Sequence, residues 1–499
     1  MATLPRSAIS RTLHHTSSLC SVCKNGIEAE VVATMLDEVW MLKQCPTHGA
    51  QDVRISTDAD WYTETRAIGA IDHRPSGAAP VHHGCPFDCG PCESHTQKVR
   101  LPVVTITSAC NLDCPICYVH NKNDGAYHMS TAEFEQILDH LLETSKGDLD
   151  LINFTGGEPT MHPDFESFLE ICARRGVHRV AICTNGIKLA RDEALVQRLA
   201  GLNARIALSY DSFEEEADVL LQGARLLGVK ARCLDLLEQY DLDTTLIPVM
   251  TKGVNDHEIG RMIELLIERP MIRHLEVHTM TYTGQGGVNF PRTGRISMAE
   301  VLDRIEETTD GFLRRADFVP SPCAHPLCYQ IAYLLVDPDG GRPVPFTRFM
   351  PRETLYACLS DHLYLEPGPK LEAALLEAID RLWADGSEEA ERTLAILKRL
   401  LRLMFPAEGP LPHEEALRVG ERACKAIYLH AHMDEETFDT ERVAQCCDSS
   451  CTADGRTVPV CAYNVLYRDK EDKFMSTPLQ WNERSGGRIS FAPEAFDDR

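Results

Sequence analysis

The middle of the chain alternates short apolar, β-branched segments with amphipathic helical segments. The first helical segment, Ser130–Lys146, begins with a capping box between Ser130 and Glu133. Strands that alternate with helices form parallel sheets through right-handed crossovers, and strands of this composition suit burial on both faces. The sequence therefore predicts an α/β fold, a partial (β/α)6 TIM-type barrel. Its predicted strands are Leu101–Thr107, Leu149–Phe154, Arg179–Cys183, Ala204–Ser209, Thr244–Val249 and Arg273–His278.

Each predicted strand is followed by a turn rich in polar residues or glycine. In chain order these turns are a cysteine loop and the segments 155–159, 184–186, 209–211, 251–256 and 279–284. The carboxyl ends of parallel barrel strands gather on one face, where such folds carry out chemistry. The turns are therefore predicted to form one active-site face.

The cysteine loop contains Cys110, Cys114 and Cys117 in the spacing C-x3-C-x2-C. Three thiolates on one loop can hold three irons of a cubane and leave the fourth iron open. A small molecule can bind and be reduced at an open iron, whereas a structural site closes every coordination position. These cysteines are the predicted catalytic ligands.

Followed by Gly156-Gly157-Glu158-Pro159, this loop resembles the signature of the radical S-adenosylmethionine (SAM) superfamily. The resemblance implies a [4Fe-4S] cluster, SAM, and a low-potential ferredoxin or flavodoxin as electron donor. It also implies that the Gly-Gly-Glu-Pro turn binds the SAM amino group, with Tyr118 beside adenine or simply packed. The complete cofactor-binding set is predicted to be Tyr118, Gly156, Gly157, Glu158, Pro159, Asn185, Ser209, Asp211 and Asn255.

Residues 1–98 are predicted to form a Cys-rich N-terminal metal-binding domain, before a radical SAM core at 99–315. Cys20, Cys23 and Cys45 lie in two knuckles that match a mononuclear tetrahedral site for zinc or a rubredoxin-like iron. Its fourth ligand is either His48 or a cysteine of the next group. That group, with a second C-x3-C-x2-C spacing, is predicted to bind an auxiliary cluster and consists of Cys85, Cys89 and Cys92.

Residues 316–499 are predicted to form a helical C-terminal domain with a further auxiliary [4Fe-4S] cluster. His430 and His432 either line a pocket or are structural, and a structural role is favoured. Leu394–Phe405 is amphipathic and either packs on the core or touches lipid, and core packing is favoured. The predicted cluster ligands of this domain are Cys328, Cys446, Cys447 and Cys461.

The net charge of −25 argues against nucleic acid as a partner, because phosphate binding needs a basic surface. No apolar run is long enough to cross a bilayer, and the first residues show no secretory signal. Twenty cysteines without an export signal indicate metal ligands in a reducing compartment. We therefore expect a cytoplasmic protein, with peripheral contact at the inner face of the membrane as an addition.

The cysteine pattern over nearly the whole chain, ending in Cys446-Cys447 and Pro459-Val460-Cys461, resembles the archaeal tetraether lipid synthases and their bacterial relatives. That family also includes proteins named pterin methyltransferases. The resemblance implies an enzyme that joins unactivated carbons of two lipid chains, with a lipid or other small hydrophobic substrate. One departure is Asp448-Ser449-Ser450-Cys451, where those synthases have a His-Tyr pair. The alternatives are a radical SAM methyltransferase of a pterin or similar heterocycle, and a non-enzymatic iron–sulfur or zinc module.

Overall fold

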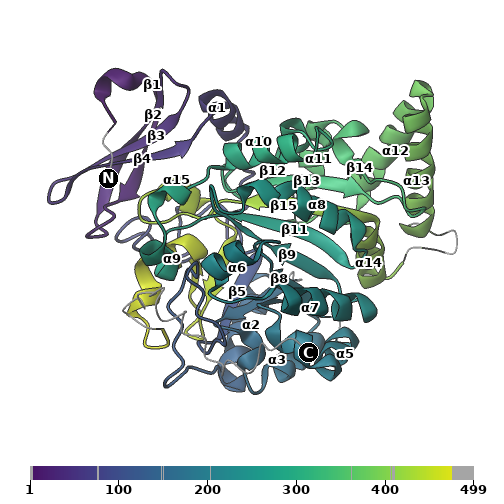
Figure 1. Ribbon diagram of the computed structural model, residues 1–499, viewed down its shortest axis with the longest axis horizontal. Coiled ribbons are helices and arrows are strands. Elements are labelled where there is room, and N and C mark those ends of the chain that lie inside the picture. Colours follow the sequence, from purple (N-terminus) through teal and green to yellow (C-terminus); the bar gives the residue numbers. More distant parts are fainter. Residues whose placement is uncertain are drawn as a thin grey trace.

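The computed structural model describes residues 4–474 except 76, 77, 148, 150, 203, 361, 405, 407, 408 and 410. Asp150 of the second predicted strand, Phe405 of the amphipathic segment and residues 475–499 of the predicted C-terminal domain lie outside the described residues. An antiparallel sheet of four strands stands at one side of the molecule, followed by α1 (Ala59–Ile68) (Figure 1). Its strands, in sheet order, are β1 (Ile9–Leu19), β2 (Gly26–Thr34), β3 (Val39–Cys45) and β4 (Gly49–Ser56).

The main sheet contains six parallel strands that are neighbours in chain order, as predicted. The fold is an α/β partial barrel. The fifth predicted strand is interrupted at Pro248, and the short β10 (Val249–Met250) pairs with the sixth strand. The six strands are β5 (Leu101–Thr107), β6 (Leu151–Gly156), β7 (Arg179–Thr184), β8 (Arg205–Ser209), β9 (Thr244–Ile247) and β11 (Ile272–Thr279).

Helices connect these strands, and the predicted capping box is present at the first of them. The Ser130 hydroxyl accepts from the backbone N–H of Glu133, whose carboxylate accepts from the N–H of Ser130. This reciprocal pairing satisfies donors that the first turn of a helix leaves free. The helices are α2 (Thr131–Thr144), α3 (Phe165–Arg174), α4 (Ile187–Arg191), α5 (Glu193–Gly201), α6 (Glu215–Gln222), α7 (Leu227–Gln239), α8 (Ile259–Glu268), α9 (Gly284–Asn289) and α10 (Met298–Thr308).

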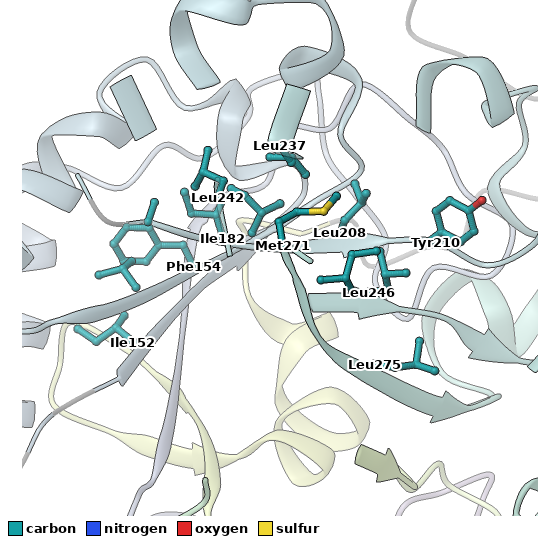
Figure 2. Packing of buried hydrophobic residues seen from close by; sticks show 14 of the residues in the cluster. Ile152, Phe154, Ile182, Leu208, Tyr210, Leu237, Leu242, Leu246, Met271 and Leu275 are labelled. Atoms are coloured by element: carbon teal, nitrogen blue, oxygen red, sulfur yellow. The ribbon is translucent and has the colours of Figure 1, made fainter. Parts of the chain in front are cut away.

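The strands and helices of the barrel share one apolar core. Phe154, Ile182, Leu208 and Leu246 come from four neighbouring strands and are fully buried. Leu237 of α7 lies against this group (Figure 2). Burying side chains of this size stabilises the fold by about 1.5–3 kcal/mol each. This packing holds the strands in place and therefore also positions the polar turns that follow them.

Strands from the last third of the chain extend the main sheet at both edges. β15 (Cys424–His430) runs parallel beside β11, and β13 (Tyr329–Leu335) and β12 (Val319–Pro320) follow it. At the other edge β16 (Asp448–Cys451) runs parallel beside β5 and leads to β17 (Thr457–Pro459). The sheet thus continues across the boundary that we predicted at residue 316, and the division into three domains stays a prediction.

Three further helices, α12 (Pro369–Asp385), α13 (Glu388–Met404) and α14 (His413–Ala423), lie at the side opposite the small sheet (Figure 1). Leu394, Leu397 and Leu400 of α13 are buried, in one cluster with Leu375 and Leu382 of α12. The described part of the amphipathic segment therefore packs against other helices, in agreement with the core interpretation. Among the described residues, every helix is too short or too polar to cross a bilayer.

Candidate functional site

The first candidate site is the loop that carries Cys110, Cys114 and Cys117 between β5 and α2. Its backbone is folded around the thiols. The N–H of Leu112 donates to Cys110 Sγ at 3.4 Å, and the N–H of Cys117 donates to the carbonyl of Cys114 at 3.0 Å. The side chain of Asn123 holds the N–H of Cys110 at 3.0 Å.

Burial raises the pKa of all three thiols, and their own mutual charge raises the pKa of Cys110 and Cys114 further. Three neighbouring thiolates, one buried and two half-buried, are therefore unfavourable without a cation among them. Iron supplies that positive charge and deprotonates its thiol ligands. The donor set of the loop fits an iron–sulfur cluster.

The turn at Gly156 and Gly157 lies directly on the cysteine loop. The N–H of Gly157 donates to the carbonyl of Thr107 at 2.8 Å, and the N–H of Glu158 donates to that of Ala109 at 2.7 Å. A Cβ atom at either glycine would overlap these same backbone carbonyls. Gly156 also has φ of +145°, which a residue with a side chain rarely adopts. Both glycines are required for the close approach of the two loops.

The Glu158 carboxylate, which we predicted to bind the cofactor, is occupied within the protein. It is 1% exposed and accepts from the hydroxyls of Thr160 at 2.7 Å and Thr184 at 2.8 Å. It also accepts from the N–H of Asn185 at 2.8 Å, so it links the ends of β6 and β7. Pro159 follows as the first residue of a short 3-10 helix, Pro159–Met161. A ligand would therefore contact the Gly156-Gly157-Glu158-Pro159 turn through its backbone and not through the Glu158 carboxylate.

The polar residues after β8 and β9 are also tied to one another. Asp211 is buried and accepts from the N–H of Val249 at 2.7 Å, and Asn255 donates to the carbonyl of Asp211 at 2.7 Å. Lys230, which the sequence analysis missed, donates to the carbonyls of Asn185 at 2.8 Å and Ser209 at 2.5 Å. The structure thus brings the predicted residues together, but it gives Asp211 and Asn255 bonds that brace the strand ends.

A cavity of about 120 Å³ lies inside the barrel beside the cysteine loop, whose Ile116 and Tyr118 form part of its wall. One water molecule needs about 10–15 Å³ by the same measure, so the cavity can hold a small organic molecule. Much of its lining is apolar. The polar side chains include Asn153, Thr155, Glu276, His278, Thr279, Thr281, His430, His432, Asp448 and Asn464.

Several of these polar groups lie close to one another. His278 Nε2 lies 3.2 Å from Glu276 Oε1, and His430 Nε2 lies 3.6 Å from Asp448 Oδ2. Burial opposes ionisation of Glu276, but its contacts with His278 and His430 outweigh burial and lower its pKa. Burial lowers the pKa of His430 and His432, which favours neutral imidazoles. His430 and His432 therefore line a pocket, and the structural role that the sequence analysis favoured was wrong as their whole role.

In the N-terminal sheet the structure brings Cys20, Cys23, Cys45 and His48 together, with their ligand atoms within 4.8 Å of one another. His48 Nδ1 lies 3.4 Å from Cys20 Sγ and 3.5 Å from Cys45 Sγ. Burial opposes ionisation of Cys20, but hydrogen bonds to its sulfur, among them one from Gln51, lower its pKa to about 6. Three thiols and one imidazole form a closed tetrahedral donor set, which fits zinc. The structure thus favours His48 over a cysteine as fourth ligand.

A family model of the radical SAM superfamily matches residues 104–266. Residues 104–266 form a radical SAM domain. Members of this superfamily use a [4Fe-4S] cluster and SAM, which agrees with the donor set of the cysteine loop. A second model, the HMPTM N-terminal zinc ribbon domain, matches residues 12–57, which contain the Cys20 site.

One relative of this radical SAM protein matches almost the whole chain. It is the 7,8-dihydro-6-hydroxymethylpterin dimethyltransferase of Methanocaldococcus jannaschii, 28% identical over 93% of this chain and 96% of its own length. The GTP 3′,8-cyclase of Chlorobaculum tepidum is 32% identical over 35% of this chain and 52% of its own length. The crystal structure of Streptococcus suis SuiB bound to S-adenosylmethionine has a TM-score of 0.35 and 19% identity, over 43% of this chain and 48% of that chain. The relative that spans the chain is thus named a pterin methyltransferase, which fits our alternative function better than lipid joining.

The two other predicted cluster sites lie near the C-terminal segment. Cys85, Cys89 and Cys92 are close enough that the charges of Cys85 and Cys92 raise the pKa of Cys89, although burial raises it more. Cys85 and Cys89 pack against the apolar cluster of the C-terminal segment. This predicted auxiliary site therefore lies beside the end of the described chain.

The four predicted C-terminal ligands, Cys328, Cys446, Cys447 and Cys461, line one small cavity. Within it the Cys447 thiol points to the Asp448 carboxylate, with Sγ 3.3 Å from Oδ1. Cys451, the additional cysteine of this segment, packs in the barrel core instead. The structure keeps Cys451 out of this group, and the ligand set itself stays a prediction.

The sequence analysis missed Glu276 and His278 as lining residues. They alternate along β11 and face the barrel interior. Alternation of polar and apolar residues is a signal that was present, but it is also typical of an ordinary half-buried strand. Only the folded partial barrel shows that this polar face borders a cavity.

Proposed function

We propose that this protein is a radical SAM enzyme that methylates a small polar heterocycle of the pterin class. The observation that carries the proposal is the cavity beside the cysteine loop, where Glu276 and Asp448 present carboxylates and Asn153 and Asn464 present amides. Carboxylates and amides pair with the ring N–H and carbonyl groups of such a heterocycle. Among the described residues, Asn464 Oδ1 is buried and lacks a hydrogen-bond partner, so it is available for a ligand.

A lipid chain matches this cavity less well. Burying a polar group against hydrocarbon without a hydrogen bond costs about 1–3 kcal/mol, and the cavity offers several such groups. The relative of nearly the same length supports the same choice, because its name refers to a pterin. We therefore do not propose the joining of lipid chains, and the experiment below includes it as a result that would contradict our proposal.

In this proposal Cys110, Cys114 and Cys117 hold the cluster. When bound, it supplies one electron that cleaves SAM and generates a carbon radical able to remove hydrogen from an unactivated C–H bond. The backbone at Gly156 and Gly157 keeps the cysteine loop against the strand ends. Lys230 fixes the carbonyls of Asn185 and Ser209, and Tyr118 separates the cluster loop from the cavity.

The net reaction balances with two molecules of SAM. One gives up its methyl group and becomes S-adenosylhomocysteine. The other is cleaved to methionine and 5′-deoxyadenosine, which takes the substrate hydrogen. Two electrons from a low-potential ferredoxin or flavodoxin complete the balance, and a substrate C–H bond becomes C–CH3.

Other metal sites belong to the same proposal. Cys20, Cys23, Cys45 and His48 hold zinc, and the groups around Cys85 and around Cys461 hold auxiliary clusters. A cytoplasmic enzyme with a diffusible substrate is expected, and peripheral membrane contact is not required.

The test uses full-length protein, prepared without oxygen, with SAM that carries a deuterated methyl group, a strong reductant and a dihydropterin. We expect 5′-deoxyadenosine and a pterin that carries the labelled methyl group. Glu276→Gln is expected to lower kcat/KM for the pterin at least tenfold, because the ring loses a charged acceptor worth about 1.5–3 kcal/mol. Glu166→Gln, a half-buried carboxylate paired with Arg198 outside the cavity lining, is the matched control and should act as wild type.

Two results would overturn the proposal. Formation of 5′-deoxyadenosine with an unlabelled, chain-joined lipid product would indicate carbon–carbon coupling. Absence of SAM cleavage despite a full iron and sulfide load would indicate a non-enzymatic cluster protein.

A further inference from the structure

Three histidines gather in the cavity because two neighbouring strands place them on one face. His278 of β11 and His430 of β15 are direct partners in the parallel register. His432 follows His430 by two residues, and alternate residues of an extended segment point to the same side. The rings are close, with centroids 5.3 Å apart for His278 and His430 and 4.0 Å apart for His430 and His432.

We infer that His278, His430 and His432 form a binding site for a divalent transition metal, next to the predicted C-terminal cluster, where Cys461 Sγ lies 3.7 Å from His432 Nδ1. One ring nitrogen of each histidine lies within 4.8 Å of those of the other two. A tetrahedral zinc ion with bonds of about 2.0–2.1 Å holds its nitrogen ligands roughly 3.4 Å apart. Small side-chain rotations therefore complete the geometry without moving the strands.

The surroundings of the three rings support metal binding. His430 is 5% exposed, and its Nδ1 has no hydrogen-bond partner among the described residues. Glu276 Oε1 lies 3.2 Å from His278 Nε2 and 3.7 Å from His430 Nδ1, so one carboxylate orients both rings. A carboxylate that orients a histidine ligand in this way is common at metal sites. With Asp448 3.6 Å from His430, two carboxylates also make the site attractive to a cation.

The donor set indicates what such an ion does. Imidazole ligands suit zinc, iron, nickel and copper ions. Three protein ligands leave one coordination position free, as in catalytic rather than structural sites. That position faces the cavity that Ile116 and Tyr118 of the cysteine loop also border. The ion binds a ring oxygen or nitrogen of the substrate and fixes its distance from the cluster loop, a role that rests on the proposed function.

The metal test needs no enzymatic activity. Full-length protein with its clusters reconstituted is incubated with a small excess of Zn2+, desalted, and analysed for zinc, iron and sulfide. We expect about two zinc ions per chain, one in the ribbon and one on the histidines. The His278→Gln/His430→Gln variant is expected to retain about one, with unchanged iron and sulfide. His274→Gln is the matched control, because His274 lies on the same strand and stacks on Tyr364.

Zinc X-ray absorption of the wild-type protein tests the same inference without a variant. A ribbon ion alone gives mainly sulfur ligands at about 2.3 Å, whereas an added histidine site raises nitrogen and oxygen ligands at about 2.0–2.1 Å to the majority. One zinc ion with mainly sulfur ligands would overturn the inference and leave the histidines as hydrogen-bonding groups. Loss of iron and sulfide in His432→Gln, with zinc unchanged, would assign His432 to the neighbouring Cys461 cluster and also overturn it. Methyl transfer by a protein that lacks the second zinc would leave the proposed function intact.

Discussion

Lys230→Met is the substitution that best separates the proposed SAM site from general stability. Lys230 is 2% exposed, and its ammonium group bonds the carbonyls that end β7 and β8, at 2.8 Å for Asn185 and 2.5 Å for Ser209. Methionine retains most of the apolar stem but removes both bonds. Hydrogen bonds to charged groups contribute about 1.5–3 kcal/mol each, so the free energy of unfolding is expected to fall by about 3–5 kcal/mol.

Lys425→Met provides the matched control at the opposite end of the barrel. Its ammonium group donates to the carbonyls of Leu266 at 2.6 Å, Arg269 at 2.8 Å and Ile272 at 2.7 Å, where β15 begins. The loss of stability should be at least as large, because three bonds are lost instead of two. Only Lys230→Met, however, releases the turns after β7 and β8. We expect it to raise the dissociation constant of SAM about tenfold, equal to about 1.4 kcal/mol, whereas Lys425→Met changes it less than about twofold.

The assays are urea denaturation followed by circular dichroism and SAM titration by calorimetry, both without oxygen on protein of equal iron content. Equal weakening of SAM binding in the two variants would show that loss of stability alone accounts for the effect. Unchanged binding in Lys230→Met would refute the assignment of these strand ends to SAM.

Two further predictions concern the metal loops. Gly157→Ala places a methyl group on the backbone carbonyl of Ala109, so we expect loss of cluster iron and of SAM cleavage, whereas Gly201→Ala, with no atom within 4 Å of the added carbon, should retain both. Cys461→Ala is expected to remove about four irons, and Cys451→Ala none, because the Cys451 thiol packs in the barrel core. Iron and sulfide analysis with chromatographic detection of 5′-deoxyadenosine checks both, and equal iron loss in the two cysteine variants would contradict the second.

The barrel strands could be predicted because their signal is local. Apolar, β-branched runs such as Leu101–Thr107 contain their own evidence, and so does the Ser130 capping box. The strands at the two sheet edges could not be predicted. Val103 pairs with Ser450, and His274 pairs with Ala426, across more than a hundred residues. Pairing at that separation depends on the assembled sheet and leaves no periodic pattern in either strand.

The candidate sites also divide into those defined by nearby residues and those that depend on the folded structure. The cysteine loop and the Gly156-Gly157 turn were visible because spacing within a few residues defines them. The choice of His48 as fourth ligand in the N-terminal group needed the sheet that brings it within 3.4 Å of Cys20. Glu158 shows the reverse case. Its sequence context resembles a cofactor ligand, but its tertiary surroundings occupy the carboxylate with Thr160 and Thr184.

The two C-terminal strands also bear on substrate choice. β15 extends one edge of the six-stranded barrel and β16 the other, and the two edges meet through side chains rather than a backbone ladder. Tyr329 stacks on His430 with ring centroids 3.8 Å apart, and its hydroxyl donates to Asp448 at 2.5 Å. Residues far from the cysteine loop in sequence thus form the polar end of the cavity. The family model of the radical SAM superfamily matches only residues 104–266, so shared cofactor chemistry does not imply a shared substrate. We therefore expect substitutions at His430 and Asp448 to change substrate preference before they change SAM cleavage.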